Sequence, residues 1–286
     1  MKYLCDDRKT REAPFISQER AKEIMGKNFF GIDEAIRYLG ICAITQEDFM
    51  TLLGIPFTAE TIAAIDKYGL NPMKQQLNAL YRVPFSEERL LQDKDTHVLV
   101  AVFPISVLEI ESNITNKRIF RLPDRYRQFT FANERHEASW HLVKKYHVEG
   151  STGTDWKNAK SLKVQKELLG SLDKLPTARV ILYTILGTYL STGEILFNET
   201  TVWSSSRIDP TNYSHVLKST RFDKVKEANA LSAIQNGNPP KQPERLMPYH
   251  ICVSGLYRGN ILMIDQFDDA ELFYIGIASE RKPNEL

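Results

Sequence analysis

The chain changes its pattern near residue 93, and this change constrains the fold more than any other feature. Before it, short apolar stretches alternate with helix caps and glycines. After it, runs rich in Val, Ile and aromatic residues are separated by turn residues, which is typical of strands. We therefore predict an α+β fold: a small helical N-terminal region (1–92), then a mostly antiparallel β core with two additional helices (93–286).

A repeat supports the helical prediction for the first part. Residues 45–62 align with residues 73–90, and each copy contains Pro-Phe, then a hydroxyl residue, then Glu in the first helical turn. Thr58 and Ser86 are the expected N-caps, because a hydroxyl oxygen accepts from the free N–H groups of a helix start. The residues expected to touch across the two starts are Phe57 with Ile62 and Phe85 with Leu90.

The second part contains apolar runs of two lengths. His97 to Phe103 is continuously apolar after its histidine and ends at a proline, which predicts a strand buried on both faces. Shorter runs, Gln128–Ala132 and Trp140–His147, are predicted as neighbouring strands. The two additional helices are predicted over Trp156–Leu169 and over Thr177–Ser191, the latter with Thr177 as cap and Gly193 as stop.

Composition limits the possible partners. The 286 residues are 42% apolar, enough for a sizeable core, and 37 Lys and Arg balance 36 Asp and Glu. Overall charge therefore favours neither nucleic acid nor an anionic membrane.

The longest apolar stretches fall short of the roughly 20 residues of a spanning helix. The charged N-terminal sequence MKYLCDDRKTREAP lacks the apolar region of a secretory signal, so a cytoplasmic location is expected.

The residues that usually bind metals or catalyse reactions are dispersed. Cys5, Cys42 and Cys252 have no paired spacing, and His136 and His141 are five positions apart, about 140 degrees around a helix. The serines at 204–206 lack the glycines of a nucleophile elbow. We therefore expect no metal, no cofactor and no catalytic residues.

The segment 117–147 has the composition of a nucleic-acid-binding face. It contains eight Lys or Arg against three Asp or Glu, interleaved with aromatic residues. Cations that follow a backbone and rings that stack on bases bind single strands in this way. A sheet that buries its rings and exposes its basic face has the same composition. The candidate residues are Arg118, Arg121, Arg125, Arg127 and Trp140.

Several blocks carry a resemblance to known proteins. VPFSEERL, KDTHVLVAVFP, GTYLSTGEILF and GIASERK resemble a group of bacterial proteins of unknown activity, over most of residues 70–281. The last block also resembles the G-F-R-x-A-R ending of formylglycine-generating-enzyme-like and C-type-lectin-like domains. The resemblance implies a C-type-lectin-like C-terminus whose loops display side chains to a ligand. The arginine after Gly276 and a suitable cysteine pair are absent, so no catalysis is carried over.

The expected function is non-enzymatic binding of a protein or a small polar ligand by the C-terminal loops. An acidic turn there follows an apolar run whose alternate residues, Ile261 and Met263, should be buried, as should Ile275 and Ile277. The alternative is a nucleic-acid-associated protein that uses segment 117–147, and an enzyme of unknown chemistry comes third. The expected ligand-binding residues are Tyr257, Arg258, Asp265, Asp268 and Asp269.

Overall fold

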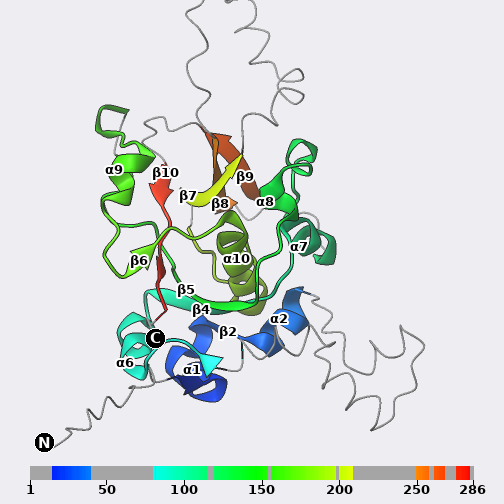
Figure 1. The fold of residues 1–286 in the computed structure, drawn as a ribbon, viewed down its shortest axis with the longest axis vertical. Coiled ribbons are helices and arrows are strands. Elements are labelled where there is room, and N and C mark those ends of the chain that lie inside the picture. Colours follow the sequence, from blue (N-terminus) through cyan, green and yellow to red (C-terminus); the bar gives the residue numbers. More distant parts are fainter. Residues whose placement is uncertain are drawn as a thin grey trace, which may run out of the picture.

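The computed structural model of the chain has an α+β fold with two larger sheets and helices around and between them (Figure 1). The predicted fold class is confirmed. Among the residues that the structure describes, no helix has both the length and the apolar character that crossing a bilayer requires. The structure describes residues 15–39, residue 80, and residues 82–114, 119–153, 156–197, 200–208, 249–257, 261–267 and 275–283.

A five-stranded sheet, in the order β2-β4-β5-β11-β6, contains the strand predicted to be buried on both faces. β4 (His97–Val102) is buried at every residue, which confirms that prediction. β2 runs parallel to β4, and the other neighbouring pairs are antiparallel. The remaining strands are β2 (Phe29–Phe30), β5 (Ser139–Lys144), β6 (Asp173–Lys174) and β11 (Glu280–Arg281).

A four-stranded sheet, in the order β10-β7-β8-β9, lies on the other side of the core. Its β10 runs parallel to β7, and the other pairs are antiparallel. Only two residues separate β10 from β11, so residues 275–281 contribute to both sheets. The strands are β7 (Thr201–Ile208), β8 (Tyr249–Tyr257), β9 (Ile261–Phe267) and β10 (Ile275–Ile277), while β1 (Ile16–Ser17) and β3 (Arg82–Val83) form a separate pair.

The helix α10 (Ala178–Thr192) lies between the two sheets and contacts strands of both (Figure 1). Its start is capped by Thr177, whose hydroxyl oxygen accepts from the Val180 N–H. Its end is Gly193 in the left-handed conformation, with φ of 75°, where a residue without Cβ is favoured. The predicted helix, cap and stop are therefore confirmed.

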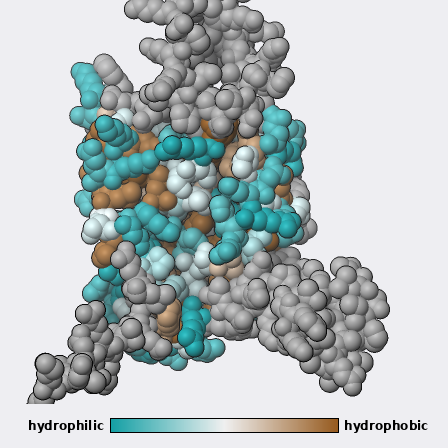
Figure 2. Space-filling view, viewed as in Figure 1, coloured by the Kyte–Doolittle hydropathy of each residue, from teal (hydrophilic) through white to brown (hydrophobic). Residues whose placement is uncertain are grey.

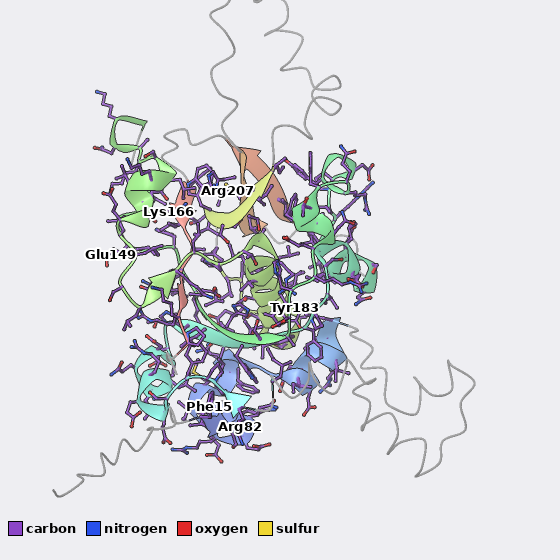
Figure 3. All side chains as sticks on the ribbon, viewed as in Figure 1. Phe15, Arg82, Glu149, Lys166, Tyr183 and Arg207 are labelled. Atoms are coloured by element: carbon purple, nitrogen blue, oxygen red, sulfur yellow. The ribbon has the colours of Figure 1, made fainter. Side chains whose placement is uncertain are left out.

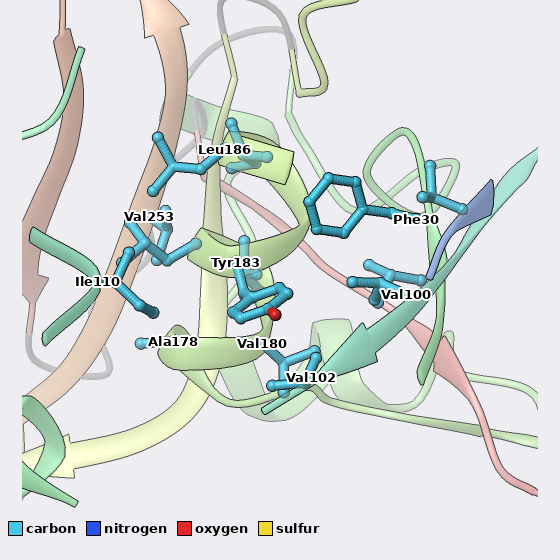
Figure 4. Packing of buried hydrophobic residues seen from close by; sticks show 14 of the residues in the cluster. Phe30, Val100, Val102, Ile110, Ala178, Val180, Tyr183, Leu186 and Val253 are labelled. Carbon is cyan, nitrogen blue, oxygen red and sulfur yellow. The ribbon is translucent and has the colours of Figure 1, made fainter. Parts of the chain in front are cut away.

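The packing of α10 explains why it lacks a polar face. Its residues from 178 to 188 are all buried, because sheets or helices cover it on every side. Tyr183 meets the ring of Phe30 edge-on with centroids 6.1 Å apart. Figure 4 shows Phe30 of β2 and Val100 of β4 beside the helix. The core therefore joins the N-terminal region to both sheets through this helix.

The described part of residues 1–92 belongs to the same hydrophobic cluster as the rest of the chain. It supplies β2 to the five-stranded sheet, and α2 packs against α10. The division at residue 93 stays a prediction, because residues 40–79 lie outside the described residues. The helices of this part are α1 (Gln18–Met25), η1 (Gly26–Asn28), α2 (Ile32–Leu39) and α6 (Glu87–Asp93).

The second copy of the repeat has the predicted helix start. The hydroxyl oxygen of Ser86 accepts from the Arg89 N–H at 3.2 Å and begins α6, and both Phe85 and Leu90 are fully buried. The first copy, with Phe57, Thr58 and Ile62, lies outside the described residues. The cap at Ser86 is therefore confirmed, whereas the repeat as a whole stays a prediction.

Two predictions for the second part are wrong. The segment Gln128–Ala132 is not a strand, since α8 (Thr130–Asn133) occupies its end. Aromatic residues favour strands, but here packing decides: the buried rings of Tyr126 and Phe131 meet edge-on at 6.1 Å. After residue 93 the described residues form four α-helices instead of two. The elements not yet given are α7 (Val107–Asn113), η2 (Asp124–Tyr126), η3 (Trp156–Asn158) and α9 (Leu162–Lys166).

Candidate binding surface and the polar clusters of the sheet

Three exposed apolar side chains lie within nine residues of one another on α9 and just after it. The exposed fractions are 43% for Val164, 40% for Leu168 and 51% for Leu172. Single exposed leucines are common on protein surfaces, whereas a group of them marks a contact site. We call these three residues, with Lys163 and Lys166, the α9 surface. Figure 2 shows hydrophobic residues gathered on the side of the molecule that carries α9.

The opposite side of α9 is fixed to the core. Leu162 is buried, and the side-chain amide of the buried Gln165 donates to the backbone oxygens of Lys160 and Ile275 at 2.9 and 3.0 Å. Ile275 belongs to β10, so the second of these bonds holds the helix against the four-stranded sheet. Because α9 is held in place from beneath, its outward residues form a preorganised surface.

Charge around the α9 surface is mostly positive. Residues 157–174 contain five lysines against Glu167 and Asp173, and one of the five, Lys174, pairs with Glu280 at 3.1 Å. Asp173 accepts a hydrogen bond from Arg281 at 2.6 Å, so its charge is already balanced. Figure 3 shows Lys166 on this side of the molecule. This surface was not predicted from the sequence, although the four-residue spacing of Val164 and Leu168 among lysines is a signal for it.

The basic aromatic segment has its rings inside the protein. Trp140 is 3% exposed and its indole N–H donates to the Leu80 oxygen at 2.8 Å, so it presents no free face to a base. Arg121 is exposed, and Arg127 donates to Glu111 at 2.8 Å. The other buried rings of the segment are Phe120, Tyr126, Phe129 and Phe131, while Tyr146 is exposed, and Arg118 and the Arg125 side chain lie outside the described residues.

The residues proposed for C-terminal ligand binding fall largely outside the described part of the chain. Arg258, Asp268 and Asp269 are outside it, as are the side chains of Tyr257 and Asp265. The backbone of Asp265 lies in β9 opposite Cys252, so this aspartate belongs to a strand and not to the predicted acidic turn. The expected burial holds for Ile275 and Ile277, while the side chains of Ile261 and Met263 are not described.

The two histidines that were considered as metal ligands have separate partners. His136 lies 3.3 Å from Glu134, and His141 lies 2.6 Å from Glu280. In the part of the chain that the structure describes, no group of three or more His, Cys, Asp or Glu side chains is arranged to hold a metal ion.

The two residues of β11 make separate polar clusters, because neighbouring side chains of a strand point to opposite faces. On one face, Arg281 donates to both oxygens of Asp93 at 3.0 and 3.1 Å and to Asp173. Asp93 is the last residue of α6 and is 5% exposed. This bidentate pair therefore joins β11 to the helix beneath the sheet.

On the other face, Glu280 joins three strands. One of its oxygens lies 2.6 Å from His141 Nδ1, and the other lies 3.1 Å from Lys174 Nζ. Ser139 Oγ lies 2.9 Å from the second imidazole nitrogen, His141 Nε2. Glu280 is 3% exposed, whereas Ser139 is half-buried. Sequence patterns could not select this set, since Glu280 lies far along the chain from Ser139.

His97, in the Arg281 cluster, gives a prediction for pH dependence. Burial lowers the pKa of His97 to about 4, despite the nearby Asp93 carboxylate. As pH falls from 6.5, the unfolded chain binds a proton on this residue while the folded protein does not. We expect this to remove up to about 3 kcal/mol of stability by pH 4.

The measurement compares the wild type with His97→Gln by urea unfolding from pH 7 to pH 4. Both proteins lose stability through their carboxylates as the pH falls, so the informative quantity is the difference between their free energies of unfolding. This difference should shift in favour of the variant at lower pH. His136→Gln, at an exposed histidine, is the control for the loss of an imidazole. A constant difference for His97→Gln would contradict the prediction.

Comparison of the chain with protein-family models, with curated proteins and with solved structures finds no match.

Proposed function

We propose that the chain is a binding protein. It recognises, through the α9 surface, a segment of a partner protein that contains both acidic and apolar side chains. The observation that carries this proposal is the exposure of Val164, Leu168 and Leu172 beside lysines, on and just after a helix that is fixed from beneath. Buried apolar contacts supply affinity, and complementary charge supplies orientation and speed of association.

A protein partner suits this surface better than a nucleic acid does. Single-stranded nucleic acid is bound mainly by stacking rings, and the ring of Trp140 is used inside the core. The centre of the α9 surface is aliphatic, and aliphatic side chains pack well against Leu, Phe or Trp of a peptide. Acidic residues beside those apolar ones would pair with Lys163 and Lys166.

The test begins with a displayed library of random 16-residue peptides selected on the folded protein. Enriched peptides should combine Asp or Glu with Leu, Phe or Trp. The variant Val164→Ser/Leu168→Ser/Leu172→Ser should bind them at least about tenfold more weakly, because it removes apolar area from the interface. Fluorescence polarisation of a labelled peptide measures the change.

Matched controls separate this surface from general stickiness. Leu91→Ser changes a leucine of similar exposure on α6 and should leave the affinity within twofold. Lys163→Glu/Lys166→Glu should weaken binding, more strongly at low salt. A labelled single-stranded oligonucleotide should not compete. Selection of peptides without acidic residues, or unchanged affinity in the triple serine variant, would overturn the proposal.

A further inference from the structure

We propose that Ser139, His141 and Glu280 form a nucleophilic site that cleaves carboxylic esters through an acyl-serine intermediate. The three side chains are joined in series: Ser139 Oγ to His141 Nε2 at 2.9 Å, and His141 Nδ1 to Glu280 Oε2 at 2.6 Å. A nucleophile bonded to a base, with the base oriented by a third group, is the geometric signature of covalent catalysis. This activity is independent of the binding function proposed above.

The protonation states follow from the partners. Burial raises the pKa of Glu280, but His141 and Lys174 together outweigh burial, so its pKa lies below the ordinary value. The ionised carboxylate can only accept hydrogen bonds, so Nδ1 of His141 must donate to it. Nε2 of the neutral imidazole then has a free lone pair, which accepts from the Ser139 hydroxyl. This is the tautomer that a general base requires.

On the opposite face of the sheet, Thr96, His97 and Asp93 also bring a hydroxyl, an imidazole and a carboxylate together, but in a different arrangement. There, Thr96 Oγ1 and Asp93 Oδ1 both approach Nδ1 of His97, at 2.8 and 3.5 Å. Nε2 of His97 is buried without a hydrogen-bond partner. Hydroxyl and carboxylate therefore compete for one nitrogen, and no proton can pass from one side of the ring to the other. His97 supports the structure, whereas His141 links two groups in series.

The serine lies at the start of a strand and is only partly buried. Ser139 is the first residue of β5 and is half-buried, and the residues 134–137 before it are exposed. The histidine behind it is 13% exposed and the glutamate 4%. The carboxylate is therefore more shielded from water than the histidine that it orients.

The chemistry balances with water as the second reactant. Ser139 Oγ attacks the ester carbonyl carbon while its proton moves to His141 Nε2, and the carbonyl electrons move onto oxygen. Collapse of this intermediate expels the alkoxide, which takes the proton from Nε2 and leaves as an alcohol. Water then attacks the acyl-serine, again giving a proton to Nε2. The second collapse returns that proton to Ser139 Oγ and releases a carboxylic acid.

The test uses a fluorophosphonate, whose phosphorus an activated serine attacks with loss of fluoride. Wild type should take up one equivalent, located by peptide mass spectrometry on Ser139. Ser139→Ala should take up none at that peptide, and His141→Gln should react at least about 100-fold more slowly.

Two further variants keep the test decisive. Glu280→Gln leaves the imidazole in place and should slow labelling at least about tenfold. It replaces His141→Gln as the test variant if circular dichroism shows that His141→Gln does not fold. Thr96→Ala, on the opposite face, should label at the wild-type rate. No label on Ser139, label on another residue only, or equal rates in folded Glu280→Gln and wild type would each overturn the proposal.

Discussion

Replacing Arg281 by alanine is expected to lower the free energy of unfolding by about 3 kcal/mol. The guanidinium of Arg281 donates to both oxygens of Asp93, which is 5% exposed, and to one oxygen of Asp173. Without it, a buried carboxylate at the end of α6 loses its bidentate partner and keeps only the longer ion pair with Arg89, at 3.8 Å. A buried charge with so little compensation is costly. Urea unfolding followed by circular dichroism measures the loss.

Two comparisons show whether the effect comes from the buried pair. Arg135 pairs with Glu109 but is 64% exposed, so Arg135→Ala should cost less than about 1 kcal/mol. Arg281→Lys keeps the charge but loses the planar fork, so its stability should lie between those of wild type and Arg281→Ala. Equal losses for Arg281→Ala and Arg135→Ala would be incompatible with our interpretation.

Gly255→Ala is expected to destabilise the protein by about 3 kcal/mol or more. Gly255 is a buried residue of β8, and a Cβ there would overlap the backbone oxygens of Leu196 and Phe197 and lie 2.9 Å from the Phe197 carbonyl carbon. Backbone atoms cannot turn aside as a side chain can, so the strand itself must shift. Thermal unfolding of the purified variant measures the effect.

An exposed glycine supplies the control for this substitution. A Cβ at Gly170 would meet only the Asp173 carboxylate, at 3.2 Å. Gly170→Ala should therefore change the free energy of unfolding by no more than about 0.5 kcal/mol. If Gly255→Ala were as stable as Gly170→Ala, the close approach of β8 to residues 196–197 would be refuted.

The elements predicted correctly are those whose signals are local. α10 has a threonine cap, a glycine stop and enough length, and β4 is a continuous apolar run. The helix α7 has an equally local signal, the capping box of Ser106 and Glu109, which the strand-rich character of the surrounding sequence obscured. For α8, the aromatic content predicted a strand, whereas the burial of Phe131 against Tyr126 favoured a helix.

The candidate sites were harder to predict because they depend on chain topology. The contact of His141 with Glu280 exists because β11 pairs beside β5, and no spacing rule connects two residues so far apart. Trp140 was selected for a nucleic-acid face, but alternation along β5 places it on the side that packs against the N-terminal region. Composition showed that rings and cations were present, but it could not show which of them were exposed.

The position of β11 has a consequence for how the chain folds. β11 lies between β5 and β6, so residues 280–281 join the edge strand β6 to the rest of the five-stranded sheet. During synthesis, β5 keeps an unpaired edge until these residues leave the ribosome. Such an edge can pair with another chain, and closing a contact between distant residues is slow. The nascent protein is therefore most vulnerable to aggregation immediately before β11 is added, when most of the core residues that the structure describes are already available.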